Sequence, residues 1–170
     1  MNAKATGRHE IRDDHNVLVL TRTFQAPITD VWAAVTEPER MARWIGTWTG
    51  DPTSGSVRFA MNAEGDDVSD EAYEIRACEP PHRLVVHAAD DSGVWDLGLE
   101  LDERNGITTL EFTQVLHDPA ILDSVGPGWE YYLDRLIAAE TGRDPSTIDF
   151  DRDYYPALSG HYAGLLPPNR

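Results

Sequence analysis

The sequence predicts an α+β domain in which a curved antiparallel sheet of about six strands wraps around one long C-terminal helix, with two short helices after the first strand. Three observations lead to this class. The middle of the chain alternates β-rich segments with short turns, two helix-start signals precede that region, and a long helical pattern follows it. With 170 residues, the chain is long enough to bury the core of one domain without disulfides or metals.

The N-terminal third is expected to hold a flexible leader, a strand and a helix. Residues 1–15 are polar and form the leader, whereas residues 16–24 are rich in β-branched and apolar side chains and predict the first strand. Pro27 ends that strand and suits the first turn of a helix. Apolar side chains then repeat at helical spacing at Ile28, Val31, Trp32 and Val35.

The middle of the chain is predicted to be a meander of strands. A second start signal at residues 36–38 predicts another short helix, and strand candidates follow it. They lie near residues 56–61, 71–79, 83–88, 94–101 and 108–117. Breaker residues separate them at 51–55, 64–67, 79–82, 90–93 and 103–106. Connections this short favour antiparallel pairing, and Asn105-Gly106 is a strong hairpin signal.

One face of the last two predicted strands is apolar and needs a cover. Side chains alternate between the two faces of a strand, so two in-phase sets share that face. They are Trp95, Leu97, Leu99 and Leu101 in one strand, and Leu110, Phe112, Gln114 and Leu116 in the next. The cover is the long helix, whose apolar residues follow the i, i+3, i+4, i+7 rule. These are Trp129, Tyr132, Leu133, Leu136 and Ile137.

Glycines mark where the long helix is predicted to bend and to end. A helical turn within residues 118–125 is expected before a kink at residues 126–128, and Gly142 ends the helix. The predicted organisation is therefore a leader at 1–15, a domain at 16–142, and a linker with a short docked C-terminal helix at 143–170. The apolar stripe of that last helix consists of Tyr155, Leu158, Tyr162 and Leu165.

Composition excludes several classes of function. The chain has 14 Lys and Arg against 30 Asp and Glu, and a formal charge of −16 repels nucleic acid and anionic membranes. No apolar run suggests a signal peptide or a membrane span. Cys78, the only cysteine, is expected as a small buried side chain. We therefore expect a cytoplasmic protein.

No metal or cofactor is expected either. Asp149, Asp151 and Asp153 imitate the start of a calcium loop, but Tyr154 stands where such a loop needs Gly. Helix capping is a sufficient role for these aspartates. No phosphate loop, dinucleotide fingerprint or serine elbow is present. His117 beside Asp118 is either a general base or, more simply, a strand-end pair in solvent.

Four segments in order resemble one family. Residues 26–39, followed by Trp44, read APITDVWAAVTEPE and resemble the opening motif of the START-related (SRPBCC) superfamily. Residues 79–85 (EPPHRLV) resemble its strand-turn-strand motif. Residues 128–136 (GWEYYLDRL) look like the closing helix of the branch named after activators of the 90-kDa heat-shock protein ATPase, and residues 153–158 (DYYPAL) are similar to a tail seen in bacterial members.

The resemblance implies the helix-grip fold, in which helix and sheet leave a cavity between them. It runs from about Val17 to Leu166. The superfamily places lipid and polyketide binding, cyclase-type catalysis, hydrolysis and chaperone stimulation on this scaffold, so the resemblance does not select one activity.

The candidate ligand-binding residues are large side chains on surfaces that this fold turns inward, where they either form solid core or line a cavity. They are Trp44, Trp48, Phe59, Tyr73, Trp95, Leu97, Phe112, Gln114, Trp129, Tyr132, Leu133 and Leu136. Gln114 is the sharpest of them, because a buried amide needs partners from protein, water or ligand. A register slip of one residue would expose it instead.

Three functions are compatible with these residues. The first is a non-catalytic protein that binds a small apolar or aromatic ligand. The second is a cyclase- or hydrolase-type enzyme that uses Gln114, Tyr73 or His117 in the same cavity. The third is a co-chaperone-like domain with a chaperone or a second copy of the chain as its partner, which requires an exposed apolar patch.

Overall fold

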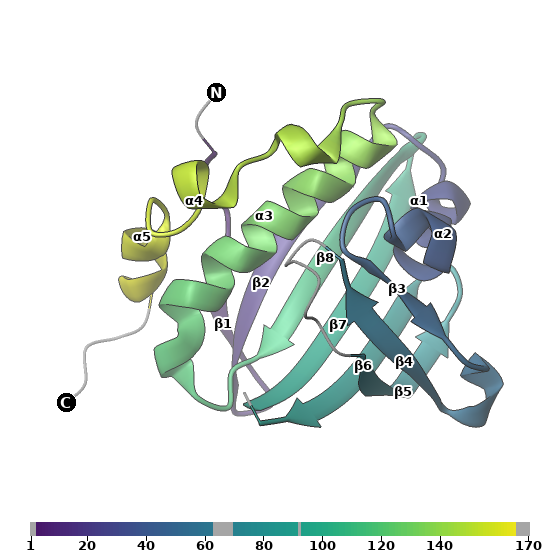
Figure 1. Ribbon diagram of the computed structural model, residues 1–170, viewed down its shortest axis with the longest axis horizontal. Coiled ribbons are helices and arrows are strands. Elements are labelled where there is room, and N and C mark those ends of the chain that lie inside the picture. Colours follow the sequence, from purple (N-terminus) through teal and green to yellow (C-terminus); the bar gives the residue numbers. More distant parts are fainter. Residues whose placement is uncertain (1–2, 63–69, 92, 166–170) are drawn as a thin grey trace.

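Eight strands form one antiparallel sheet in the part of the chain that the structure, a computed structural model, describes: residues 3–62, 70–91 and 93–165 (Figure 1). The strands are β1 (Arg8–Arg12), β2 (His15–Phe24), β3 (Gly46–Thr49), β4 (Ser56–Met61), β5 (Glu71–Glu79), β6 (Arg83–Asp90), β7 (Gly93–Arg104) and β8 (Ile107–Val115). Their order across the sheet is β1-β2-β8-β7-β6-β5-β4-β3.

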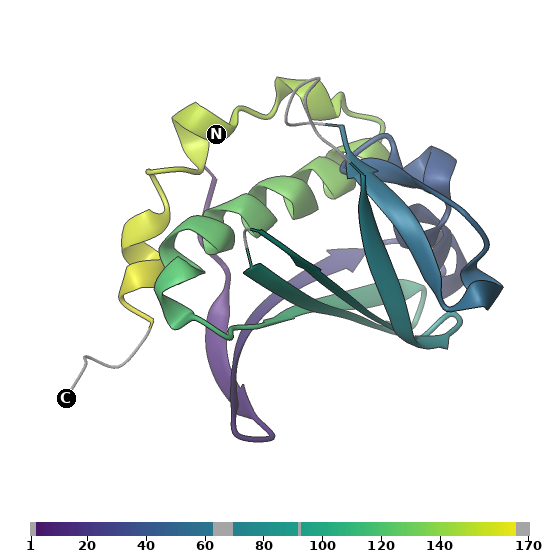
Figure 2. The same ribbon diagram turned by 60° about the horizontal axis from the view of Figure 1, so that its bottom comes forward.

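Helices cover one face and one end of this sheet. They are α1 (Ile28–Thr36), α2 (Pro38–Met41), α3 (Leu122–Glu140), α4 (Phe150–Asp153) and α5 (Ser159–Ala163), with short 3-10 turns η1 (Pro52–Ser54), η2 (Pro119–Ile121) and η3 (Pro145–Thr147). The sheet curves around α3, which crosses its concave side, while α1 and α2 lie at one end (Figures 1 and 2). This arrangement confirms the predicted α+β helix-grip class, with more strands than the expected six.

The central meander agrees closely with the sequence pattern. β4 and β5 occupy the same residues, 56–61 and 71–79, that the alternation predicts. Asn105 and Gly106 join β7 to β8 with φ values of 54° and 79°, the left-handed pair that tight hairpin turns require. The turn expected at residues 64–67 lies outside the described residues, as does Leu166.

The N-terminus departs from the expected leader. Arg8–Arg12 is a strand that pairs antiparallel with β2, through a turn at Asp13 and Asp14. Its polar composition concealed it, because β1 is an edge strand and edge strands often carry charge. The Nη1 atom of Arg12 lies 2.9 Å from Oε1 of Glu111 on β8. The sheet therefore includes residues that the sequence pattern assigned to a mobile segment.

The helical insert also contains a strand that the pattern did not predict. Gly46–Thr49 pairs with β4, with Trp48 opposite Phe59. Trp48 therefore belongs to the opposite sheet edge from β1. The segment is four residues long and is too short to show a period in the sequence.

The long helix α3 runs without interruption from Leu122 to Glu140, so the turn expected within residues 118–125 is partly the first turn of this helix. The helix starts at Leu122 and contains Pro127. Gly126 is a close-packing position: a Cβ atom there would lie 2.3 Å from Cδ1 of Tyr162. The glycine that resembled a helix breaker thus makes room for the Tyr162 ring of α5.

The C-terminal tail forms two short helices where the stripe predicted one. Asp149 caps α4, since its Oδ1 accepts a hydrogen bond of 3.0 Å from the backbone N of Arg152. Leu158 and Tyr162 are buried, whereas Tyr155 is 40% exposed. The α5 helix packs against α3 and the Gly7 backbone N–H donates to the Tyr162 hydroxyl at 3.1 Å.

A buried polar network fixes α3 to β2 and to the N-terminal segment. Glu130 is completely buried, and its Oε1 accepts a hydrogen bond of 2.8 Å from Nη2 of Arg22 on β2. The backbone N–H and the hydroxyl of Thr6 also donate to the Glu130 carboxylate. Asp134, one turn further, accepts from Arg22 and from the Tyr154 hydroxyl. This network joins the N-terminal segment, β2, α3 and the tail.

Candidate ligand-binding cavity

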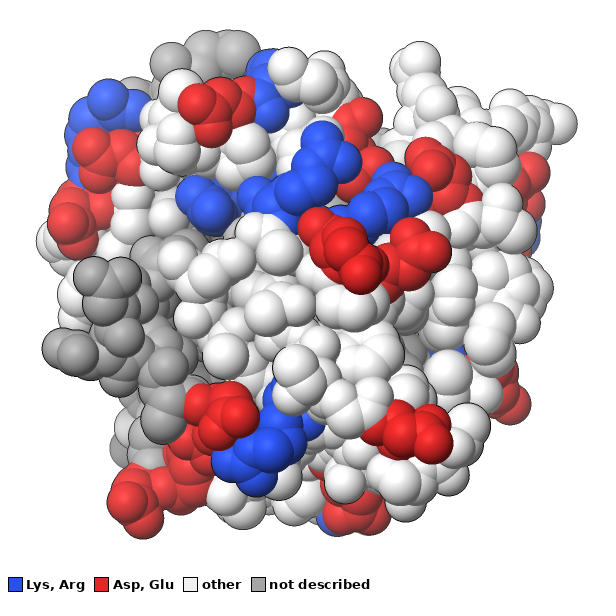
Figure 3. Space-filling view, turned by 45° about the vertical axis from the view of Figure 1, so that its right-hand side comes forward, with Lys and Arg blue, Asp and Glu red and all other residues white. Residues whose placement is uncertain are grey.

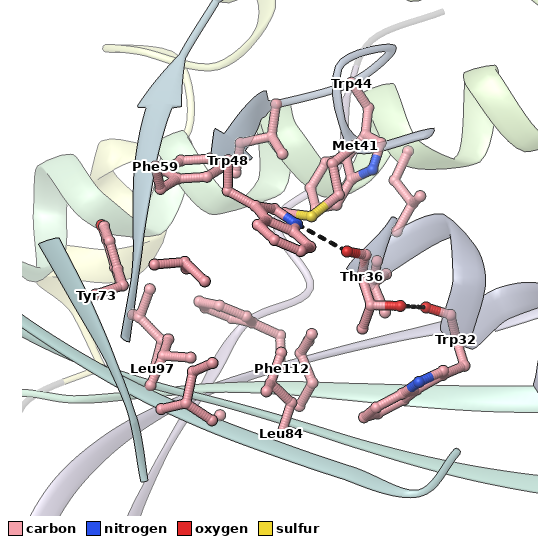
Figure 4. Close-up of a pocket in the computed structure, with 18 of the residues that line it drawn as sticks. Trp32, Thr36, Met41, Trp44, Trp48, Phe59, Tyr73, Leu84, Leu97 and Phe112 are labelled. Atoms are coloured by element: carbon pink, nitrogen blue, oxygen red, sulfur yellow. Dashed lines mark hydrogen bonds between the residues drawn. The ribbon is translucent and has the colours of Figure 1, made fainter. Parts of the chain in front are cut away.

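A cavity of about 260 Å³ lies between α3, the α1–α2–β3 insert and the concave side of the sheet (Figure 4). It is larger than the roughly 150 Å³ apolar cavity that is known to take up benzene. Seven aromatic side chains contribute to its wall. They are Trp32, Trp44, Trp48, Phe59, Tyr73, Phe112 and Trp129.

The strands supply the cavity wall through their alternation. The side chains of Leu97 and Leu99 of β7 face the cavity with that of Phe112 of β8, whereas the side chains of the alternate residues, such as Asp96 and Glu111, point to the other face. Leu84 and Val86 continue the wall on β6. Each of these positions follows from the period of two.

Cys78 reaches the cavity through an irregularity in β5. Tyr73 and Ile75 face the cavity, and strict alternation would place Ala77 next. The register shifts between Ile75 and Ala77 where β5 pairs with β6, and this bulge moves Cys78 onto the cavity side. The sequence prediction of a buried Cys78 is wrong, because this residue is exposed.

The cavity separates two differently packed parts of the interior. On the β2 side, Leu18 and Leu20 are fully buried. On the β4–β6 side, inward-facing residues such as Phe59 and Val86 stay only half-buried, because the space that they face is open. The sheet is thus wide enough to continue past the region that α3 can fill.

The wall offers few free polar groups, because three of its four indoles, those of Trp44, Trp48 and Trp129, donate to other protein atoms. Nε1 of Trp44 donates to the Ala34 carbonyl at 2.9 Å, and Nε1 of Trp48 donates to the Thr36 carbonyl at 2.8 Å. The hydroxyl of Thr36 in turn donates to the Trp32 carbonyl at 2.6 Å (Figure 4). Among the described residues, no Asp, Glu, His, Lys or Arg lines the cavity.

The phenol of Tyr73 is a titratable group of the cavity wall. Burial raises the pKa of Tyr73 to about 12, with a further contribution from the Asp90 and Glu71 charges. Its ring meets Phe59 edge to face at 5.6 Å between centroids. The hydroxyl therefore stays protonated at neutral pH.

Three of the predicted site residues lie outside the wall: Trp95, Gln114 and Tyr132. Trp95 pairs with Ala88 near the start of β7, where β6 and β7 are joined, and does not line the cavity. Tyr132 is buried against the rings of Trp129 and Tyr131. The nine other predicted residues line the cavity. They are Trp44, Trp48, Phe59, Tyr73, Leu97, Phe112, Trp129, Leu133 and Leu136.

Gln114 is not part of the cavity wall, but it hydrogen-bonds Trp129, which is. It is fully buried, as the alternation predicts, and its Oε1 accepts a hydrogen bond of 2.7 Å from Nε1 of Trp129. Its Nε2 is buried with no hydrogen-bond partner among the described residues. The amide thus holds the Trp129 indole, which packs on Phe112 at 4.3 Å between centroids.

Some wall residues were not among the predicted ones. Leu99 is in phase with Leu97, so the alternation was a sufficient signal for it. Trp32, Thr36 and Met41 come from the α1–α2 insert. Trp32 belongs to the apolar stripe predicted for residues 28–35, but the stripe alone did not show whether it faces solid core or a cavity. Their placement depends on how the insert closes the end of the sheet.

His117 lies on the convex side of the sheet, away from the cavity wall. Its Nε2 is 2.5 Å from Oδ2 of Asp96, and Nδ1 of His87 is 2.5 Å from the other oxygen. Partial burial of Asp96 opposes its ionisation, but the hydrogen bonds from both imidazoles outweigh it and lower the pKa of Asp96. Asp118 instead caps η2 through the backbone N–H of Ala120.

Charge on the outer surface is mixed. On the face that Figure 3 shows, basic and acidic side chains lie next to one another, with a broad uncharged area between the charged groups. Within the described residues, no group of His, Cys, Asp and Glu side chains is suited to holding a metal ion. None of the described helices is long and apolar enough to cross a bilayer.

A curved sheet around a helix with an apolar cavity between them defines a helix-grip protein of the START-related superfamily. Residues 25–139 match the family described as Activator of Hsp90 ATPase homolog 1-like protein, and the chain belongs to this family. No curated protein sequence matches the chain.

Solved structures agree with this assignment. CalU16 from Micromonospora echinospora is 26% identical over 97% of this chain and 98% of its own, with a TM-score of 0.75. DynU16, whose description refers to the dynemicin biosynthetic locus, is 26% identical with a TM-score of 0.64 over 76% of this chain and 49% of its own. The protein encoded by BPP1335 from Bordetella parapertussis, at 22% identity over 100% of this chain and 98% of its own, has a TM-score of 0.71 and shows the same fold.

Proposed function

We propose that the protein binds a small apolar ligand in the cavity and performs no chemistry on it. The observation that carries this proposal is the cavity of about 260 Å³ in the middle of the domain, with half-buried apolar side chains on its sheet wall. Apolar surface left facing open space forfeits part of its burial free energy, and an apolar ligand would recover it.

The composition of the wall favours binding over acid–base catalysis. The titratable wall residues are Tyr73 and Cys78, and burial keeps the Tyr73 phenol protonated at neutral pH. His117 faces away with Asp96, and Gln114 bonds Trp129. A cyclase or hydrolase would thus have no carboxylate or imidazole of the described wall at its reacting atoms.

The test is a cavity-filling substitution with a matched control on the same strand. Val86→Trp places an indole into the cavity, whereas Val85→Trp places the same group on the opposite face of β6. The probe is N-phenyl-1-naphthylamine, a neutral dye that fluoresces in apolar surroundings. We expect the wild-type chain and Val85→Trp to bind the dye, and Val86→Trp to lose at least about tenfold in affinity.

Two results would end the proposal. One is the absence of dye binding to the wild-type chain in fluorescence and in native mass spectrometry. The other is equal binding by Val86→Trp, which would place the dye elsewhere. Circular dichroism and urea unfolding of both variants establish that each is folded.

Chaperone binding is the second candidate, because the family description refers to an activator of the Hsp90 ATPase. The large exposed apolar residues of the described chain are Ile11, Val94, Ile107 and Tyr155. They lie on separate strands and on the tail, so they do not supply the contiguous patch that such a partner favours. A pull-down with a purified Hsp90 middle domain tests this function, and light scattering tests self-association as a dimer.

A further inference from the structure

The ligand class follows from the hydrogen-bonding capacity of the wall, an inference that rests on the proposed function. The cavity has no charged side chain among its described lining residues, so an ionised group inside it would lose its hydration without a counter-ion. Carboxylates and phosphates are therefore poor ligands. The ligand must be neutral in the part that enters.

The polar groups of the wall that have no hydrogen bond to another described residue can donate one. The indoles of Trp44, Trp48 and Trp129 all donate to acceptors of the protein. The Tyr73 hydroxyl and Trp32 Nε1 have no hydrogen bond to another described residue, and Figure 4 shows the two rings at opposite sides of the cavity. A ligand thus meets two donors that bond no other described residue, and the acceptor among these two groups is the Tyr73 oxygen.

Tyr73 is the more adaptable of these two donors. A phenolic O–H rotates about its C–O bond to meet an acceptor, whereas an indole N–H is fixed in the plane of its ring. Burial keeps this phenol protonated over the physiological range, so it remains a donor. A buried tyrosine hydroxyl ordinarily finds a partner.

The rest of the wall suits a flat aromatic body. Aromatic rings surround the cavity, and the thioethers of Met41 and Met61 line it too. Rings attract other rings through offset and edge-to-face contacts, and methionine sulfur contacts aromatic rings favourably while adapting to irregular shapes. The volume exceeds that needed for a single benzene ring.

We propose that the cavity binds a neutral, fused-ring aromatic compound whose polar group is a hydrogen-bond acceptor, such as an aryl ketone, and that the Tyr73 hydroxyl donates to that acceptor. Tyr73 then determines which end of the ligand faces β5. Anionic ligands of the same shape are rejected.

Three naphthalenes of nearly equal shape test the proposal by isothermal titration calorimetry. They are 2-acetylnaphthalene with a carbonyl acceptor, 2-isopropenylnaphthalene with a methylene in its place, and 2-naphthoate with a negative charge. We expect the ketone to bind about two- to tenfold more tightly than the alkene, as one net hydrogen bond allows, and at least about tenfold more tightly than the anion.

Variants assign the hydrogen bond to its donor. Tyr73→Phe removes only the hydroxyl, and we expect the ketone-to-alkene ratio of affinities to fall to about one while the alkene binds as before. Tyr155→Phe, at a 40% exposed tyrosine of the tail, is the control and keeps the ratio of the wild-type chain. Because the readout is a ratio, small packing changes cancel.

The outcomes separate this inference from the proposed function. If 2-naphthoate binds as tightly as the ketone, or if Tyr73→Phe keeps the wild-type ratio, the inference is wrong although the cavity still binds ligands. If none of the three compounds binds and the dye does not bind either, the proposed function fails together with it.

Discussion

The two sides of α3 differ in how they are packed. Behind the helix and along β2 and β8, side chains such as Leu20 and Glu130 are fully buried, and the N-terminal segment and the tail complete the packing. In front of β4–β6, inward-facing side chains such as Val86 border an open cavity. One domain therefore combines a closely packed part with a part that encloses an open cavity.

The largest expected effect is in the buried ion pair of the packed side. Arg22→Met leaves the fully buried Glu130 carboxylate without its guanidinium partner, and we expect a loss of about 3–5 kcal/mol in the free energy of unfolding. Urea unfolding measures it. The double variant Arg22→Met/Glu130→Leu should recover part of the loss. A single variant within about 1 kcal/mol of wild type would show that the pair does not hold α3.

The same truncation in both regions compares them directly. Leu20→Ala removes a fully buried side chain from the packed side, and a loss of about 2–5 kcal/mol is expected from burial and the new cavity. Leu97→Ala removes a half-buried side chain from the cavity wall, where about 1 kcal/mol is expected because part of its surface already faces open space. Equal losses in thermal and urea unfolding would remove the distinction between the two regions.

Alanine substitutions at two glycines of α3 distinguish the effect of close packing from that of helix propensity on the free energy of unfolding. Gly126→Ala puts a methyl group against the Tyr162 ring, and we expect overpacking to cost about 1–3 kcal/mol. Gly128→Ala meets no atom within 4 Å and should stabilise the helix by about 0.5–1 kcal/mol. Opposite signs in the two unfolding free energies are the expected result, and a neutral Gly126→Ala would contradict the close contact.

The smallest expected effect is on the convex side, at Asp96. Its pKa is lower in the folded chain than in the unfolded chain, so its contribution to stability is present above the unfolded pKa and is lost as pH falls through the folded pKa. Asp96→Asn should cost about 1 kcal/mol at neutral pH. The difference between wild type and variant should shrink between about pH 5 and pH 2. A difference independent of pH in this range would exclude the bonds to His87 and His117 as its source.

Residues whose surroundings are local were predicted well. The boundaries of β4 and β5, the hairpin at Asn105-Gly106 and the cap at Asp149 each depend on a few neighbouring residues, whose alternation, φ preference or side-chain oxygen acts within one element. The inward direction of Gln114 followed from the same alternation.

Residues whose roles depend on neighbours far away in the sequence were not predicted correctly. Gly126 resembles a helix breaker until Tyr162, far along the chain, packs on it. Arg8–Arg12 resembles a leader until β2 and Glu111 pair with it. Cys78 lines the cavity because a bulge shifts its strand, and alternation alone cannot show a bulge.

Periodicity and turn chemistry are properties of neighbouring residues, and they were enough to establish the order of elements and the apolar face of each one. The cavity exists because the curved eight-stranded sheet is wider than the part of it that α3 and the insert cover. How much of the sheet stays uncovered depends on the curvature of the sheet, on how α3 crosses it, and on packing between residues far apart in the sequence. The sequence pattern places both Trp95 and Trp129 on surfaces that face inward. Of these two residues, only Trp129 lines the cavity in the folded chain.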